Sequence, residues 1–318
     1  MSDFRIPLGD WVASGVDWIV DNGKALFDVL RTIFLGLYDA MDWLASTPSA
    51  WIVIAVIAVG ALFARGWRFA VGATLGLTLI VGVDQWDNAM DTLALVVVAA
   101  FLAIIIAIPL GIAAARSPIV STVTKPVMDF LQTMPAFVYL IPALLLFRVG
   151  VAPGIFATIL FSLAPGVRLT ELGIRGVDSE VVEAGHAFGA TPARILRQIQ
   201  LPLALPSIMA GVNQVIMLSL SMVVIAGMVG AGGLGGEVVA SLGRLDTGLG
   251  VEAGLSVVIL AILLDRFTGA FGQKRGIYAR WRKGRASATS SEEVIAPKDG
   301  QTATDIVDRN HASKPGVL

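Results

Sequence analysis

Long stretches without charged side chains constrain the fold of this chain of 318 residues more than any other feature. Apolar runs of about 20 residues predict membrane-spanning helices. Charged residues make up 15% of the chain and the mean hydropathy is +0.79, which excludes an ordinary soluble domain. We therefore predict an all-α, polytopic membrane protein with about seven transmembrane helices. The apolar runs, of which the shortest need their polar flanks to span, are residues 49–64, 69–83, 92–115, 130–147, 154–167, 203–229 and 253–264.

The placement of Lys and Arg predicts how these helices are oriented. If the polar segment 171–202 lies inside and the chain crosses the membrane at each run, most of the 23 basic residues fall inside. Basic residues concentrate on the cytoplasmic side of membrane proteins. We therefore predict a bacterial cytoplasmic membrane protein with its N-terminus outside and its C-terminus inside. The basic residues left outside are Arg5, Lys24, Arg31, Arg148 and Arg244.

Residues 1–48 are predicted to form an amphipathic segment on the outer surface of the membrane. The start is acidic and has no short apolar core before a small-residue cleavage site, so it is not a signal peptide. A short soluble helical segment outside the membrane is the alternative. The apolar residues at helical spacing, with Trp at the interface, are Trp11, Trp18, Phe27, Leu30, Phe34, Leu37, Met41 and Leu44.

The rest of the chain divides into three parts. Residues 49–83 carry two peripheral scaffold helices, and the core at 84–271 is richer in Pro and polar residues, which a membrane tolerates where protein or water satisfies the backbone. Residues 272–318 form a tail, basic at first and then of disordered composition. The basic cluster either anchors the topology or contacts anionic lipid and senses ionic strength. Its members are Lys274, Arg275, Arg280, Arg282, Lys283 and Arg285.

The polar segment 171–202 has the composition of a short helix, a turn and a second helix. Thr191 is suited to cap a helix that starts at Pro192, and Gly185 and Gly189 are expected to break up the preceding helix. Small residues permit close approach to another protein, and charged residues are available at the rim. We expect an element that protrudes into the cytoplasm and sits in a cleft of a partner. Its contact residues are Glu183, Ala184, Ala187, Ala190, Arg194 and Arg197.

The spacing within this segment resembles the cytoplasmic loop of bacterial ABC importer permeases. That loop has Glu-Ala-Ala, three residues, Gly, nine residues and Ile-x-Leu-Pro. Here Gly185 replaces the second Ala, and the rest of the pattern is present. Residues 85–270, which include LQTMPAFVYLIPALLLF and LPLALPSIMAGVNQVIMLSLSMVV, resemble the permease subunit of glycine betaine/proline betaine importers.

The resemblance implies a type I ABC importer in which the chain pairs with a second copy of itself. It also implies separate ATPase subunits, a separate extracytoplasmic substrate-binding protein, and transport of compatible solutes. The residues predicted to couple to the ATPase are Glu183, Ala184, Gly185, Gly189, Ala190, Thr191, Pro192, Arg194, Ile199, Leu201 and Pro202.

The residues independently predict an external source of energy. The apolar runs contain no charged residue, whereas proton-driven transporters carry intramembrane acids, bases or His. The chain also lacks the phosphate loop G-x-x-x-x-G-K-[ST]. We therefore expect a non-catalytic permease subunit with no cofactor of its own, ATP and Mg being held by the ATPase. With no Cys and two His, a metal site is not expected.

One glycine pattern, Gly230 to Gly235, matches G-x-G-x-x-G but follows a predicted membrane helix instead of a strand. A dinucleotide site requires a βαβ unit. The glycines are therefore interpreted as a tight outer turn and a re-entrant segment, placed to contact the binding protein. Neither a nucleotide nor a nucleic acid is an expected ligand of this chain.

Polar, aromatic and Met side chains in the core are candidates for the translocation path. Aromatic faces attract quaternary ammonium groups, buried polar groups in lipid need partners or a cavity, and Met forms flexible apolar gates. Helix packing is the alternative role for each of them. The candidates are Gln132, Met134, Pro135, Tyr139, Asn213, Gln214, Met217, Ser221 and Met222.

Three other functions stay open at this point. The alternatives to a betaine permease are an ABC permease for another solute, such as choline, methionine or a sulfonate, an osmotically gated channel, and a scaffold without transport. The 171–202 pattern cannot separate the solutes, while the match at 203–270 favours betaines. A channel would have no use for the loop, and a scaffold leaves the polar residues of the core unexplained.

Overall fold

The computed structural model describes residues 7–272, and within that range every regular element is a helix. The predicted all-α class is confirmed. Residues 1–6 and the tail, with the basic cluster from Lys274 to Arg285, lie outside the described residues. The proposed division into parts stays a prediction.

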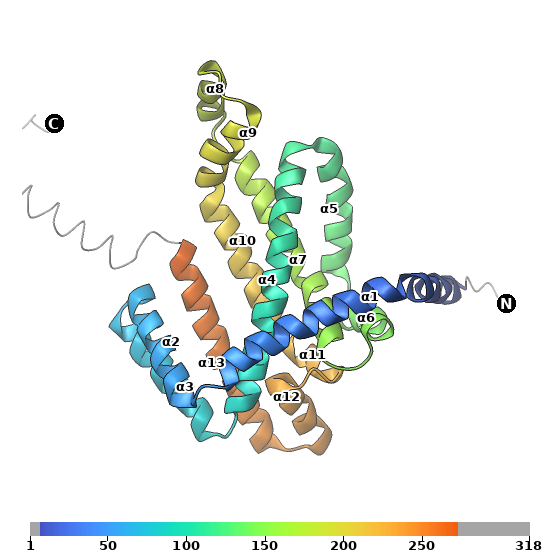
Figure 1. Ribbon diagram of the computed structural model, residues 1–318, viewed down its shortest axis with the longest axis vertical. Coiled ribbons are helices and arrows are strands. Elements are labelled where there is room, and N and C mark those ends of the chain that lie inside the picture. The colour runs from blue at the N-terminus through green and yellow to red at the C-terminus, as the bar shows by residue number, and fades with distance from the viewer. Residues whose placement is uncertain (1–6, 273–318) are drawn as a thin grey trace, which may run out of the picture. The chain divides into compact units, whose positions relative to one another are not determined.

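The centre of the structure is built from long helices that run side by side (Figure 1). Small residues allow the close approach of α4 and α7. A Cβ atom at Gly111 would lie 2.7 Å from the Val167 carbonyl oxygen, and one at Gly166 would lie 2.7 Å from the Ala107 Cβ. Such small-residue contacts are typical of helix pairs in membranes. The central helices are α4 (Trp86–Arg116), α7 (Val151–Arg175), α10 (Leu201–Ser221) and α13 (Thr247–Gly272).

Two shorter helices, α2 (Ala50–Arg65) and α3 (Trp67–Gly82), form a hairpin beside α13. The hairpin turns at Gly66, whose φ of 96° lies in the region that glycine favours. A Cβ atom at Gly76 would lie 2.8 Å from Ile259, so α3 and α13 are closely packed. These helices correspond to the runs predicted as peripheral scaffold helices.

The run predicted as one span at 130–147 is sharply bent in the structure. Helix α5 (Pro118–Thr133) ends before Pro135, and the chain continues through a 3₁₀ turn, η1 (Ala136–Tyr139), into α6 (Leu140–Phe147) at 109° to α5. Proline restricts the preceding residue to extended conformations, and Met134 has a ψ of 135°. A proline in a charge-free run has here produced a broken helix.

By length and apolarity, four helices of the described region are able to cross a membrane. They are α4, α7, the continuous stretch Pro192–Met228 and α13, and the number rises to six if each of two bent pairs is one span. Three of the predicted seven runs are not among the four. Helices α2 and α3 have 16 residues each, fewer than the roughly 20 that a perpendicular span needs, and the run 130–147 is broken by the bend after α5.

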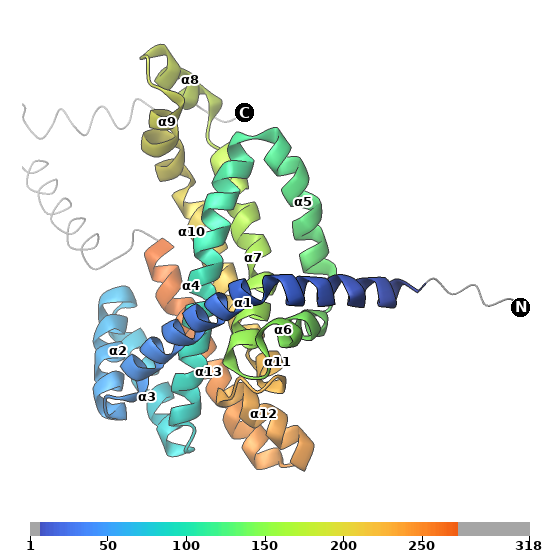
Figure 2. The same ribbon diagram turned by 45° about the vertical axis from the view of Figure 1, so that its right-hand side comes forward.

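Helix α1 (Leu8–Ser46) crosses α4 on the side away from α10 and packs on α4 and α6 (Figures 1 and 2). Phe34 is buried against Phe147, with ring centroids 5.5 Å apart. Trp11, Trp18 and Trp43 are all more than 60% exposed. The segment is therefore a single amphipathic helix with a packed side and an unpacked, Trp-bearing side, as the residue spacing predicts.

The glycine-rich segment lies between α11 (Val223–Met228) and α12 (Gly233–Arg244). Gly230, Gly232 and Gly233 all have positive φ angles. A Cβ atom at Gly235 would lie 2.1 Å from the Val223 carbonyl oxygen, so only glycine lets α11 and α12 approach this closely. A helix precedes these glycines, so the βαβ context of a dinucleotide site is missing here.

Candidate functional site

The segment between α7 and α10 folds as two short helices at the end of the molecule opposite α12 (Figure 1). They are α8 (Ser179–Ala187) and α9 (Pro192–Ile195). The Asp178 carboxylate accepts a hydrogen bond from the Glu180 N–H at 2.9 Å, and the Thr191 hydroxyl accepts one from the Arg194 N–H at 3.4 Å. Both contacts cap helix N-termini. The sequence had predicted this cap at Thr191.

The turn between α8 and α9 depends on Gly189. Its φ is 74°, a left-handed conformation that costs most L-residues energy. The Ala190 N–H donates to the Gly185 carbonyl at 3.1 Å, and the Gly189 N–H donates to the His186 carbonyl at 2.9 Å. This turn reverses the chain at the tip of the protruding element.

Gly185 has a different role from the one expected. It does not break the helix, because α8 continues through it to Ala187. A Cβ atom at Gly185 would lie 2.8 Å from Ile199 Cδ1 and 3.4 Å from Ile195 Cγ1. The glycine that departs from the family pattern therefore seats α8 against the residues that lead into α10.

The α9 helix continues without a break toward the bundle. Leu196–Gln200 form a π-helical stretch, η2, and α10 begins at Leu201 with Pro202 in its first turn, where proline is tolerated. Ile195 and Leu196 are buried. The predicted coupling residues thus lie on one connected element, and Glu183, Arg194 and Arg197 are exposed on it.

Sequence reasoning missed Phe188, which is 92% exposed at the end of α8. A large apolar side chain at the tip of a protruding element is a feature of contact surfaces. The signal in the sequence is a single aromatic residue within the otherwise small-residue run from Ala187 to Ala190.

A cavity of about 290 Å³ lies behind this element, where α8 and α9 meet the ends of α4 and α7. The element is therefore not packed solidly onto the bundle. The residues that line the cavity include Arg116, Arg175, Val182, His186, Pro192 and Gln200.

Three of the predicted path residues come together in one apolar cluster. Tyr139 and Met222 are buried in it, and Met134 packs against it from the bend after α5. The Tyr139 hydroxyl donates to the Leu131 carbonyl, and its ring lies edge-on to Phe161 with centroids 6.5 Å apart. The cluster joins the bend in the α5–α6 segment to the junction of α10 and α11.

Asn213 lies elsewhere. Its amide nitrogen donates to Asp265 Oδ1 at 3.2 Å, and its amide oxygen accepts a hydrogen bond from the Thr268 hydroxyl. Both partners belong to α13, so Asn213 joins α10 to α13. The Asp265 carboxylate, 41% exposed, lies one residue beyond the run predicted to be free of charge.

Other predicted path residues face outward on this single chain. Gln214 and Ser221 are exposed on α10, and Met217 between them is half-buried. Residues four and seven positions apart share one side of a helix. Gln132 and Pro135 are exposed around the bend after α5. Polar groups on a membrane helix require water or protein beside them, so this side of α10 is not suited to lipid.

With this geometry described, the similarity of the chain to known proteins identifies its class. A family model described as "Binding-protein-dependent transport system inner membrane component" matches residues 107–276. The chain therefore belongs to this family of inner-membrane transport components.

Two curated relatives narrow the class. The glycine betaine/carnitine transport permease protein of Listeria monocytogenes is 45% identical over 85% of this chain and 96% of its own length. The glycine betaine/proline betaine transport system permease protein of Escherichia coli is 45% identical over 84% of this chain and 76% of its own length. The predicted resemblance and the prediction of a permease subunit are confirmed.

The fold is also found in a solved transporter. The MetNI methionine ABC transporter, in inward-facing conformations, matches with a TM-score of 0.53 over 58% of this chain and 93% of the matched chain. At 23% sequence identity, the match shows that the chain has the fold of an ABC importer permease.

Proposed function

We propose that this chain is the membrane subunit of an ATP-driven importer of glycine betaine, proline betaine or a similar compatible solute. One observation supports the proposed coupling to an ATPase: α8, the Gly189 turn and α9 protrude at one end and lead directly into α10. The solute follows from the relatives, whose names specify glycine betaine.

The protruding element is the docking site for the ATPase in this proposal. Exposed Glu183, Arg194 and Arg197 supply charged contacts, and Phe188 supplies an apolar anchor. When ATP closes the ATPase pair, the element follows, and the continuous helix from Pro192 carries the movement into the bundle. ATP hydrolysis, on the partner with its Mg, then resets the pair.

The solute passes between this chain and a second copy of it. The exposed polar side of α10, with Gln214 and Ser221, lines the path, and the cluster of Met134, Tyr139 and Met222 forms the gate beside it. A path without charged groups suits a solute of no net charge. Asn213 holds the adjoining helix and does not contact solute.

In the membrane, α8 and α9 face the cytoplasm, and α1 and α12 lie toward the outside, where a separate binding protein delivers solute. The supporting fact is that Arg116 and Arg175 line the cavity beside α8 and α9 and that Arg194 lies on α9, since basic residues concentrate on the cytoplasmic side. The N-terminus is then outside and the C-terminus inside, and the Trp side of α1 contacts lipid.

The test is uptake of labelled glycine betaine into proteoliposomes that hold this chain, its ATPase and its binding protein. We expect uptake that requires all three proteins and ATP on the side of the ATPase. Competition with choline, methionine and a sulfonate determines the solute class.

Each other outcome rejects a defined part of the proposal. ATP-dependent uptake of methionine but not betaine would overturn the solute and leave the mechanism. Flux that needs neither ATP nor partners would overturn the coupling and support a channel. No flux of any solute by the complete assembly would support a scaffold.

A further inference from the structure

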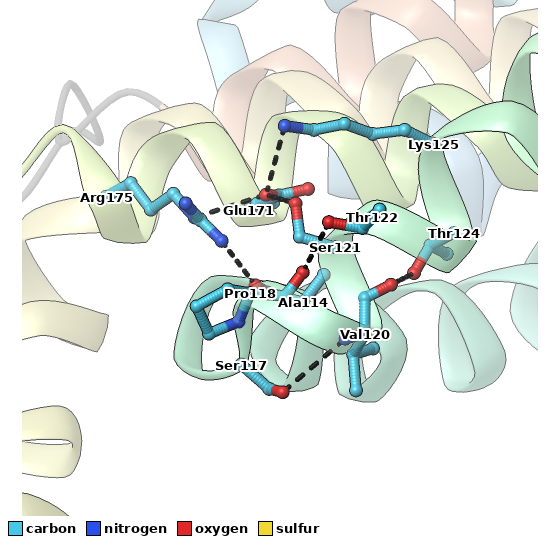
Figure 3. A network of polar contacts seen from close by, with 10 residues as sticks. All are labelled: Ala114, Ser117, Pro118, Val120, Ser121, Thr122, Thr124, Lys125, Glu171 and Arg175. Carbon is cyan, nitrogen blue, oxygen red and sulfur yellow. Dashed lines mark hydrogen bonds and ion pairs between the residues drawn. The ribbon is translucent and has the colours of Figure 1, made fainter.

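Near the end of α7, a buried carboxylate has a role that neither the docking site nor the path explains. Glu171 is 7% exposed. Its Oε1 accepts a hydrogen bond from the Ser121 hydroxyl at 2.7 Å, and Arg175 Nε and Lys125 Nζ lie 3.1 and 4.0 Å from the same atom (Figure 3). A buried charge with this many partners holds its surroundings in one arrangement.

The contact joins three helices next to the protruding element. Ser121 and Lys125 lie on α5, whereas Glu171 and Arg175 lie on α7. Arg175 Nη2 also donates to the Ala114 carbonyl, 2.8 Å away in the last turn of α4. Arg175 is the last residue of α7, and α8 begins at Ser179. Any displacement of α8 is therefore applied close to Glu171.

Few other contacts hold α5 on the bundle. Its outer side is exposed at Ile119, Val123, Val127 and Phe130. Asp129 pairs with Arg168, but the side chains are 65% and 40% exposed, and such surface pairs add little stability. The apolar attachment of α5 consists of a small cluster around buried Met128 and of Leu131, which also packs against the cluster of Tyr139 and Met222. Glu171 makes the buried polar connection between α5 and α7.

The far end of α5 is the bend at Met134 and Pro135, where the chain turns by 109° into η1 and α6. Met134 there packs on the cluster with Tyr139 and Met222. Helix α5 runs without a break from Pro118 to Thr133, with Pro126 inside it. It therefore connects the end held at Glu171 to the bend at Pro135 and to this cluster.

We propose that Glu171 is a positioning residue that makes α5 move together with α7, so that movement of α8 reaches the bend at Pro135. The inference rests on the proposed function, since it concerns how that importer couples hydrolysis to transport. If α5 separated from α7, the carboxylate would lose its Ser121 and Lys125 partners inside the protein, which is costly.

The test uses the complete importer in proteoliposomes and measures solute uptake and ATP hydrolysis in the same vesicles. Glu171→Gln keeps the shape of the side chain and removes its charge. We expect hydrolysis to continue while uptake per ATP falls by about tenfold or more, because breaking a buried ion pair is strongly destabilising. Glu252→Gln is the matched control, since this exposed residue on α13 undergoes the same chemical change far from α5. It should leave the ratio unchanged.

A purely structural role predicts a different result. Uptake and hydrolysis would then fall in proportion, through loss of assembled importer, and an unchanged ratio would overturn the proposal. The wild-type importer in the same experiment tests the proposed function separately. If Glu171→Gln does not assemble, Ser121→Ala removes the interhelix hydrogen bond and leaves the Glu171–Arg175 pair. It too should lower uptake per ATP, and an unaltered ratio again counts against the proposal.

A cross-link provides an independent test, because the chain has no cysteine. The double variant Ser121→Cys with Glu171→Cys should be uncoupled, and joining its thiols with a short bifunctional reagent should restore uptake per ATP. If the joined protein transports less than the unjoined one, α5 and α7 must move apart during transport and the proposal is wrong.

Discussion

Gly189 shows how one residue can determine the form of the protruding element. Its φ of 74° makes the turn between α8 and α9, and no atom lies within 4 Å of the position where a Cβ would be. Space is available for a side chain, so the constraint is on the backbone alone. The sequence predicted a turn between two short helices, and the structure has that turn at Gly189, a residue type that turns favour.

We predict that Gly189→Val weakens binding of the ATPase by about fivefold or more, because an L-residue in this conformation costs about 1–2 kcal/mol. Co-purification of the ATPase with the membrane subunit measures this effect. Gly189→Asn is the matched variant, since Asn tolerates left-handed backbone, and it should bind almost normally. Equal loss in both variants would mean that side-chain size, not backbone conformation, limits binding.

Phe188 allows a second prediction at the same scale. We expect Phe188→Ala to weaken ATPase binding by about thirtyfold, because truncation of a central aromatic anchor costs about 2 kcal/mol. Thermal stability of the isolated subunit should not change, since the side chain is 92% exposed. Phe101→Ala, at a 54% exposed position on α4, is the control and should bind normally. Normal binding by Phe188→Ala would remove this residue from the interface.

The role of Gly185 could not be derived from the sequence. The pattern placed it in the loop, and its glycine suggested a break in the helix. Folding brings Ile195 and Ile199 against it, and these contacts span a turn whose geometry depends on Gly189. The sequence suggests that Gly185 is needed for its backbone freedom. The structure shows that it is needed because a side chain there would obstruct the packing of α8.

At the scale of elements, the sequence contains a signal for the bend after α5, although hydropathy alone predicts one continuous span there. The run 130–147 has no charge, which favours a continuous span, yet Pro135 lies inside it. Hydropathy reflects the free energy of transferring side chains into lipid. It takes no account of the backbone N–H that proline lacks and that a continuous helix needs as a hydrogen-bond donor. The structure resolves the conflict by ending α5 at Thr133 and starting a new helix after the proline.

Asn213 and Gln214 are adjacent in sequence but lie on different sides of α10, and this separates their expected effects. Asn213→Leu should lower the stability of the purified subunit by about 1 kcal/mol, because interhelical hydrogen bonds in membranes contribute about that much. Thermal unfolding in detergent measures the change. Gln214→Leu should leave stability unaltered and reduce uptake. The reverse pattern would place Asn213 in the path and assign packing to Gln214.

For the whole molecule, the exposed polar side of α10 predicts where a second copy lies. Ser221→Cys in an otherwise cysteine-free chain should give cross-linked dimers in membranes with a bifunctional thiol reagent, because a two-fold axis that runs beside this side of α10 would bring the same residue of both copies together. Val258→Cys, on an exposed apolar side of α13, is the control and should stay monomeric on denaturing gels. Dimers from Val258→Cys alone would place the interface on α13 instead.

The order of residues along the chain was enough to predict the helical membrane class, the position of the protruding element and the family. These properties depend on composition along a helix, on glycine and proline at fixed spacings, and on residues close together in the chain. Tertiary structure alone decided that Asn213 faces α13, that Met134, Tyr139 and Met222 meet, and that Glu171 joins α5 to α7. The partners in these contacts lie up to 88 positions apart in the numbering from Met134 to Met222, and local spacing contains no information on which distant helix packs on which side.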